Sequence, residues 1–136
     1  MATFKNILLP VNLDSEDFSY MKKAAELAAG FGEKTHFLYV NDEQAGYRHP
    51  TDREDDVALK VREIVPGEIL GKMKTVFAVS KGDLAGEIEA YCRKENIDLL
   101  IVGHKHRGRF YNAMFDSSDI NIVDKVKLPI LVIPRD

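Results

Sequence analysis

Five short apolar runs recur along the chain and predict five β-strands. They lie at residues 7–11, 35–40, 74–79, 99–102 and 130–133. The first and fourth runs are continuous rather than alternating, reading Ile-Leu-Leu-Pro-Val and Leu-Leu-Ile-Val. Continuous apolar runs are typical of strands that are covered on both faces, as in parallel sheets. The pattern therefore favours a sheet that lies between two layers of helices.

The segment after the first strand predicts a helix, because apolar residues recur at helical spacing over residues 18–28. Asp14 or Ser15 is the expected N-cap, since the side-chain oxygen of either residue can accept a hydrogen bond from the first helical turn. Gly30 and Gly32 are the expected stop, because helices commonly end at a glycine in the left-handed conformation.

Three further helices are predicted by apolar spacing together with capping residues at their starts. They begin at Thr51, at Asp83 and at Asp116-Ser117-Ser118. Pro66-Gly67 is expected to end the first of these helices, and the last is expected to reach Val126.

Strands that alternate with helices imply parallel pairing and right-handed crossovers. The chain of 136 residues fits one domain, and no internal repeat or linker divides it. The sequence therefore predicts a single α/β domain over residues 1–136, with a mainly parallel, Rossmann-like sheet. In such sheets ligands bind outside the carboxyl ends of the strands, where the strand order reverses. If the first and fourth strands are neighbours, that crevice lies between Val11-Asn12 and Gly103-His104.

The segment that follows the fourth strand is the strongest candidate for anion binding. We expect that strand to stop at Gly103, and a basic loop follows at residues 104–109. The helix start at residues 116–118 would offer free backbone N–H groups to an anion. Two interpretations remain open for the basic loop, and two for Asp116. The basic loop is either an anion site or a solvated surface loop, and Asp116 either repels a phosphate or only caps its helix.

Composition and charge argue against several classes of protein. The net charge of -3 argues against generic nucleic-acid binding, which usually shows as a basic excess. No apolar run approaches the roughly 20 residues of a membrane helix, and no signal-peptide core is expected. The single Cys92 permits no internal disulfide, which agrees with a reducing compartment. We therefore expect a cytoplasmic protein that binds neither nucleic acid nor membrane.

Candidates for catalysis and metal binding are few. No Ser-His-Asp or Cys-His set shows a recognisable local motif, so no catalytic residue is predicted. His104 and His106 could supply two metal ligands, but two ligands make a poor site, and no metal is expected. His36 is expected to be packed or exposed, and Cys92 lies on an apolar helix face where a small buried hydrophobe is the default.

Four stretches of the sequence together resemble the universal stress protein family along nearly the whole chain. They are the run that ends in Asn12, the pair Gly82-Asp83, residues 98–104 and residues 128–134. The resemblance implies the strand order 3-2-1-4-5 and a homodimer that pairs through the last strands. In one branch of the family it also implies ATP in the crevice described above.

The ATP-binding branch resembles a pattern of Gly, two residues, Gly, nine residues, Gly, and then Ser or Thr. On this chain the first Gly is Gly103, His106 and Asp116 stand at the other two glycine positions, and Ser117 fits the hydroxyl position. Asn12 stands where that branch has an acidic residue. The chain is more similar to the universal stress protein A class, which does not bind ATP.

Two functional hypotheses follow. The first is a dimeric stress-response protein that acts by binding a partner or ligand and catalyses no reaction. The second is an adenine-nucleotide-binding protein that takes ATP in the crevice. ATP or another adenine nucleotide is therefore the one candidate cofactor, and the sequence does not establish it. The candidate nucleotide- or anion-binding residues are Pro10, Val11, Asn12, Val40, Gly103, His104, His106, Arg107, Asp116, Ser117 and Ser118.

The last strand is the expected homodimer interface. Its apolar core consists of Ile130, Leu131, Val132 and Ile133. Such a strand would be an aggregation hazard if it lay exposed at a sheet edge, and pairing with a two-fold copy removes that edge. The sequence also leaves room for a protein partner that it does not identify.

Overall fold

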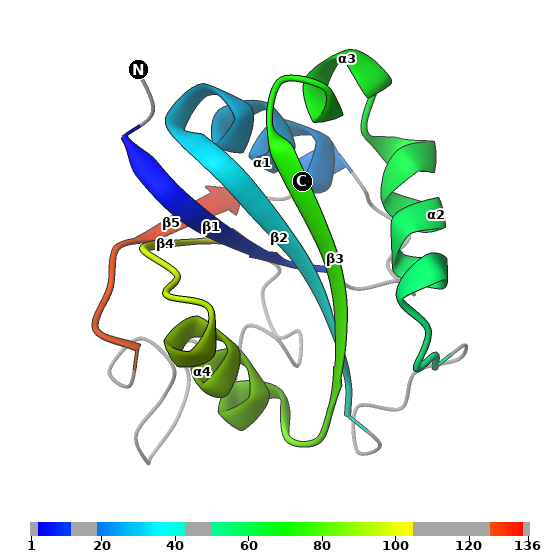
Figure 1. Cartoon of the computed structure of the whole chain (residues 1–136), viewed down its shortest axis with the longest axis vertical. Helices are drawn as coiled ribbons and strands as arrows, with labels where there is room; N and C mark the ends of the chain where they lie inside the picture. The colour runs from blue at the N-terminus through cyan, green and yellow to red at the C-terminus, as the bar shows by residue number, and fades with distance from the viewer. Residues whose placement is uncertain (1–2, 12–18, 43–49, 105–125, 135–136) are drawn as a thin grey trace.

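A parallel β-sheet forms the centre of the computed structural model, which describes residues 3–11, 19–42, 50–104 and 126–134 (Figure 1). Within these residues five strands form one sheet in the order β3-β2-β1-β4-β5. Their bounds are β1 Phe4–Pro10, β2 Gly32–Asn41, β3 Lys74–Lys81, β4 Leu99–His104 and β5 Ile130–Pro134. Every pairing is parallel. The predicted fold class and strand order are therefore confirmed.

Helices cover both faces of the sheet, as the continuous apolar runs predicted (Figure 1). In the described part of the chain they are α1 Ser19–Phe31, α2 Glu54–Ile64, the short α3 Gly67–Leu70 and α4 Leu84–Lys94. The apolar sides of α1 and α2 pack on one face and that of α4 on the other. No helix among the described residues has the length and apolar character needed to cross a membrane.

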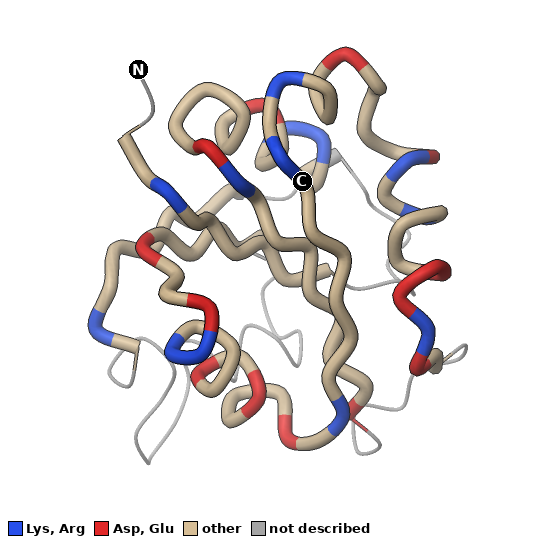
Figure 2. The backbone as a smooth tube through the Cα atoms, in the orientation of Figure 1, with Lys and Arg blue, Asp and Glu red and all other residues tan. Residues whose placement is uncertain are grey.

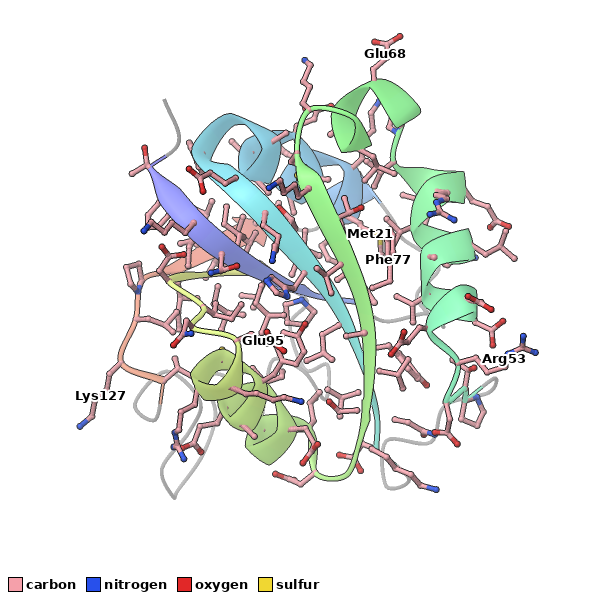
Figure 3. The ribbon with its side chains drawn as sticks, viewed as in Figure 1. Met21, Arg53, Glu68, Phe77, Glu95 and Lys127 are labelled. Carbon is pink, nitrogen blue, oxygen red and sulfur yellow. The ribbon has the colours of Figure 1, made fainter. Side chains whose placement is uncertain are left out.

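Alternate residues of each central strand belong to different core layers. Leu9 and Ile101 pack with α1 and α2, whereas Leu8 and Leu100 pack with α4. This division follows from the two-residue period of a strand. Met21 of α1 and Phe77 of β3 lie in the first of these layers, and Figure 3 shows both side chains on the inner side of α2.

The first helix ends where the sequence predicted, but without the expected cap. It was expected to stop at Gly30 and Gly32, and α1 ends at Phe31, between these two glycines. Neither glycine has a positive φ, so neither forms a left-handed cap. Gly32 instead admits the side chain of Ile7, with which any Cβ at this position would collide.

The predicted start of α2 is wrong. Thr51 was expected to cap this helix, but the N-cap is Arg53. The hydroxyl of Thr51 accepts a hydrogen bond from the backbone N–H of Arg53 at 3.1 Å and donates to the carboxylate of Asp56. Thr51 therefore shapes the turn before the helix. In contrast, Asp83 caps α4 as predicted, accepting from the backbone N–H of Gly86 at 2.9 Å.

The expected end of the second helix at Pro66-Gly67 is confirmed, since α2 ends at Ile64, and Val126 is helical as predicted. The other predicted helix ends lie outside the described residues. These are the expected caps Asp14 and Ser15 and the helix start at residues 116–118.

A carboxylate fixes the start of the central ladder. Asp98, directly before β4, accepts hydrogen bonds from the backbone N–H groups of Lys5 and Asn6, both at 2.9 Å. The N–H of Asp98 in turn donates to the carbonyl oxygen of Asn6 at 2.9 Å. β1 and β4 come from opposite halves of the chain, and these hydrogen bonds fix the register between them at the start of the ladder.

Asp98→Ala should lower the free energy of unfolding by about 1–3 kcal/mol, because two backbone N–H groups lose their acceptor. Asp98→Asn keeps one acceptor oxygen and should lose roughly half as much. Urea denaturation measures both changes. Lys23→Ala, at an exposed position of α1, is the control and should stay within about 0.5 kcal/mol of the parent. A loss for Asp98→Ala no larger than this control would contradict the role given to Asp98.

Candidate functional site

The carboxyl ends of β1, β2 and β4 meet at one edge of the sheet, and the ladder between β1 and β4 ends early there. It joins Ile7 with Leu99 and Leu8 with Leu100. Because β2 and β5 lie on opposite outer sides of β1 and β4, the strand order reverses between these two strands. This is the position at which parallel sheets bind ligands.

Beyond this ladder each strand follows its outer neighbour. β1 stays with β2, since Pro10 pairs with Leu38 and the N–H of Val11 donates to the Leu38 carbonyl at 2.9 Å. Pro10 has no backbone N–H, so it cannot donate to any ladder. β4 stays with β5, pairing Gly103 with Ile133. The two central strands thereby frame the predicted crevice.

The described candidate residues lie at this edge, and most are buried. Pro10, Val11 and Val40 are buried apolar residues at the ends of β1 and β2. Gly103 is half-buried, and His104 is the next residue of β4. The structure therefore brings together residues from three strands that the sequence had placed around one crevice.

The expectation for Gly103 needs correction. β4 does not stop at Gly103 but continues through it to His104. The φ of Gly103 is not positive, so the residue does not provide a left-handed loop start. Its Cα lies against the ring of Tyr20 instead, since a Cβ placed on Gly103 would be 2.5 Å from Cδ2 of that ring.

Three residues at this edge were missed by the sequence reasoning. Tyr20, from the first turn of α1, is one of them. Asn41 and Asp42 at the end of β2 are buried, and their polar groups are used within the protein. Asn41 donates its amide N–H to Asp52 at 2.8 Å, and Asp42 accepts from the backbone N–H of Leu84 at 3.1 Å. The sequence signal for Asn41 and Asp42 was their position directly after the apolar run at residues 35–40.

The other candidate nucleotide- or anion-binding residues lie outside the described residues. They are Asn12, His106, Arg107, Asp116, Ser117 and Ser118.

A second polar cluster lies on the α4 side of the sheet, centred on His36. This histidine is 2% exposed. Its Nδ1 lies 2.7 Å from the hydroxyl of Tyr91, and its Nε2 lies 3.1 Å from the side-chain oxygen of Asn6. Because the Asn6 oxygen can only accept, Nε2 carries the proton and Nδ1 accepts from Tyr91. Both ring nitrogens are therefore occupied inside the protein.

Burial lowers the pKa of His36, an effect that Glu95 opposes and Lys34 reinforces. Burial also raises the pKa of Tyr91 to about 12, with Glu95 contributing. Both shifts keep the cluster neutral near pH 7. These properties are those of a structural hydrogen-bond network in the core.

Two further observations concern reactive groups. Burial raises the pKa of the Cys92 thiol to about 12, with Glu89 contributing, so the thiol is protonated at neutral pH. Within the described ranges, no three His, Cys, Asp or Glu side chains come together as metal ligands would.

The all-parallel sheet, whose strand order reverses between β1 and β4, defines a doubly wound α/β protein of the Rossmann-like class. The sequence profile of the Universal stress protein family matches residues 3–134. The chain therefore belongs to the universal stress protein family.

One relative and two solved structures illustrate the likeness. The universal stress protein A homolog of Haemophilus ducreyi is 28% identical over an alignment 148 positions long, gaps included, which covers 96% of this chain and 96% of the relative. A universal stress protein in complex with cAMP has a TM-score of 0.67 at 12% identity, with 98% of each chain covered. A family member from Arabidopsis thaliana with AMP bound has a TM-score of 0.56 at 17% identity, with 97% of this chain and 92% of that chain covered. At these identities the two structures show a common fold.

The His36 cluster predicts a pH dependence of stability. The pKa of His36 is lower in the folded chain than its usual value near 6.5, so the unfolded chain binds more protons below that pH. The free energy of unfolding should therefore fall as the pH drops from about 6.5 toward the lowered folded pKa. Urea denaturation over a pH series measures this slope. His36→Gln should remove it, and an unchanged slope in that variant would assign it to other groups.

Proposed function

We propose that this universal stress protein acts as a homodimer that binds a partner or ligand and catalyses no reaction. The observation that carries the dimer is β5, an apolar strand at the end of the strand order. The non-catalytic part is supported by the states of Cys92 and His36. The thiol is protonated at neutral pH, and both imidazole nitrogens are hydrogen-bonded inside the core.

The composition of β5 favours pairing with a second copy. Ile130, Leu131 and Val132 are partly exposed, although β5 pairs with β4 along its length. No described strand lies on its outer side. An apolar, β-branched edge of this kind promotes association unless it is covered. Antiparallel pairing with a two-fold copy would cover it with a closed, symmetric interface.

The opposite edge of the sheet has features that disfavour such pairing. β3 carries exposed lysines at both ends, Lys74 and Lys81, and Figure 2 shows basic residues near both ends of this strand. Two-fold pairing centred on β3 would set Lys74 of one copy against Lys81 of the other. Like charges on facing positions oppose pairing, and edge lysines are a common protection against it. The two edges therefore differ in the way that a dimer through β5 requires.

Val132→Lys and Leu131→Asp should each shift the protein from dimer toward monomer or aggregate, because a charge would be placed in the proposed interface. Multi-angle light scattering measures the mass. Val76→Lys is the matched control, since it places the same charge in the other edge strand, β3, and should leave the dimer intact. An unchanged dimer in both β5 variants would place the interface elsewhere.

Adenine-nucleotide binding in the crevice is the second candidate function. It is favoured by the early end of the β1–β4 ladder and by the cAMP and AMP in the two similar structures. The departures from the glycine pattern at His106 and Asp116 oppose it. A carboxylate about 4 Å from a phosphate charge costs on the order of 4 kcal/mol at an effective dielectric constant near 20.

The double variant His106→Gly, Asp116→Gly should bind ATP at least tenfold more tightly than the parent, a gain of about 1.4 kcal/mol. The gain should shrink as salt is added, because the restored attraction is electrostatic. Titration calorimetry with ATP and Mg²⁺ measures the affinity. The ultraviolet spectrum of each purified sample shows carried-over nucleotide clearly, since the chain has no Trp. A folded double variant with unchanged affinity would leave Asn12 or the crevice shape as the obstacle.

A further inference from the structure

Tyr20 and Gly103 form a close contact at the edge of the sheet where the crevice lies. Tyr20 belongs to the first turn of α1 and is 6% exposed, within the core layer that also contains Val11 and Ile133. A Cβ built on Gly103 would lie 2.5 Å from Cδ2 and 2.7 Å from Cε2 of its ring. Real Cβ atoms do not approach other atoms so closely, so only glycine fits beneath this ring.

The contact with Tyr20 explains why a glycine stands at position 103, and the sequence did not suggest this reason. Glycines in phosphate-binding loops provide positive φ or allow a ligand to approach the backbone closely. Gly103 has no positive φ and lies in β4, paired with Ile133. The group that approaches its backbone closely is the Tyr20 ring. The space above Gly103 on the α1 side is therefore filled by the protein itself.

The ring covers the α1 side of β4 beyond the end of the β1–β4 ladder. The β1–β4 ladder ends at Leu8 and Leu100, and Gly103 lies beyond that point on β4. A ligand that contacted the β4 backbone from the α1 side would have to displace Tyr20. Displacing a buried aromatic side chain exposes roughly 150–250 Å² of surface, which opposes binding.

We propose that Tyr20 is a specificity-determining residue at this edge of the sheet and that its ring hinders adenine nucleotides from reaching the backbone of β4. This inference deepens the second candidate function, since it names a residue that limits nucleotide binding in addition to His106 and Asp116. Exclusion depends on the ring and not on the hydroxyl. Tyr20→Phe should therefore behave as the parent does, unlike replacements that remove the ring.

The test compares three replacements of Tyr20 by titration calorimetry with ATP and with AMP. Tyr20→Ala and the milder Tyr20→Leu remove the ring, and each should bind ATP at least tenfold more tightly than the parent. Tyr20→Phe keeps the ring and should bind as the parent does. Phe37→Leu is the matched control, because Phe37 is a buried aromatic of the same core layer, and it should give no gain. Thermal denaturation identifies which variants are folded.

Three results would overturn the proposal. One is a folded Tyr20→Leu variant that binds ATP no better than Tyr20→Phe. Another is a parent protein that binds ATP as tightly as Tyr20→Ala. The third is a gain in Phe37→Leu equal to that in Tyr20→Leu, which would assign the effect to a loosened core.

Gly103→Ala provides a second measurement that needs no ligand. In the parent this variant should lower the melting temperature, because the added methyl group meets the Tyr20 ring. In the Tyr20→Leu background the same change should cost much less. Equal losses in both backgrounds would show that the ring does not fill the space above Gly103, and would overturn the proposal.

The outcome for the proposed dimer is read separately from the same samples. Light scattering reports the mass of each Tyr20 variant, and β5 lies outside the contact being changed. A monomeric parent would therefore refute the dimer while leaving the affinity comparison for Tyr20 intact.

Discussion

The carboxyl edge of the molecule depends on how far the hydrogen-bonded ladder between β1 and β4 extends. Only at this pairing does the strand order reverse, because β2 follows β1 on one side and β5 follows β4 on the other. The ladder starts where Asp98 holds the backbone of Lys5 and Asn6, and its last described pair is Leu8 with Leu100. A longer ladder would close the crevice, whereas a shorter one would expose the apolar centre of the sheet.

Buried and half-buried polar side chains in this fold join segments that are distant in the sequence. Asp98 serves the start of the central ladder, and Asp42 serves the N-terminus of α4 through the N–H of Leu84. His36 joins β1, β2 and α4 through Asn6 and Tyr91. Burying such groups is costly unless their hydrogen bonds are made. Each of them therefore fixes one position of the fold, which apolar packing alone would leave less specific.

The strands could be predicted because burial on both faces leaves a direct mark in the sequence, as at residues 7–11 and 99–102. The cap of α4 could be predicted because Asp83 bonds only three residues ahead, to Gly86. The start of α2 could not, since Thr51 has the chemistry of a cap but contacts Asp56 across a wider turn. The role of Tyr20 depends on a residue of a distant strand, and no local pattern near position 20 shows it.

Gly103 shows why a glycine pattern alone does not establish a ligand. In a sequence, one missing side chain is compatible with a left-handed turn, with a ligand close to the backbone, or with a side chain close to the backbone. The φ of Gly103 excludes the first of these, and the Tyr20 ring occupies the space that the second would need. The strand order of the family, which reverses between β1 and β4, is therefore retained here, while the Tyr20 ring from α1 covers the backbone of Gly103. Members of this family should therefore be compared at both positions, the side chain in the first turn of α1 and the glycine of β4.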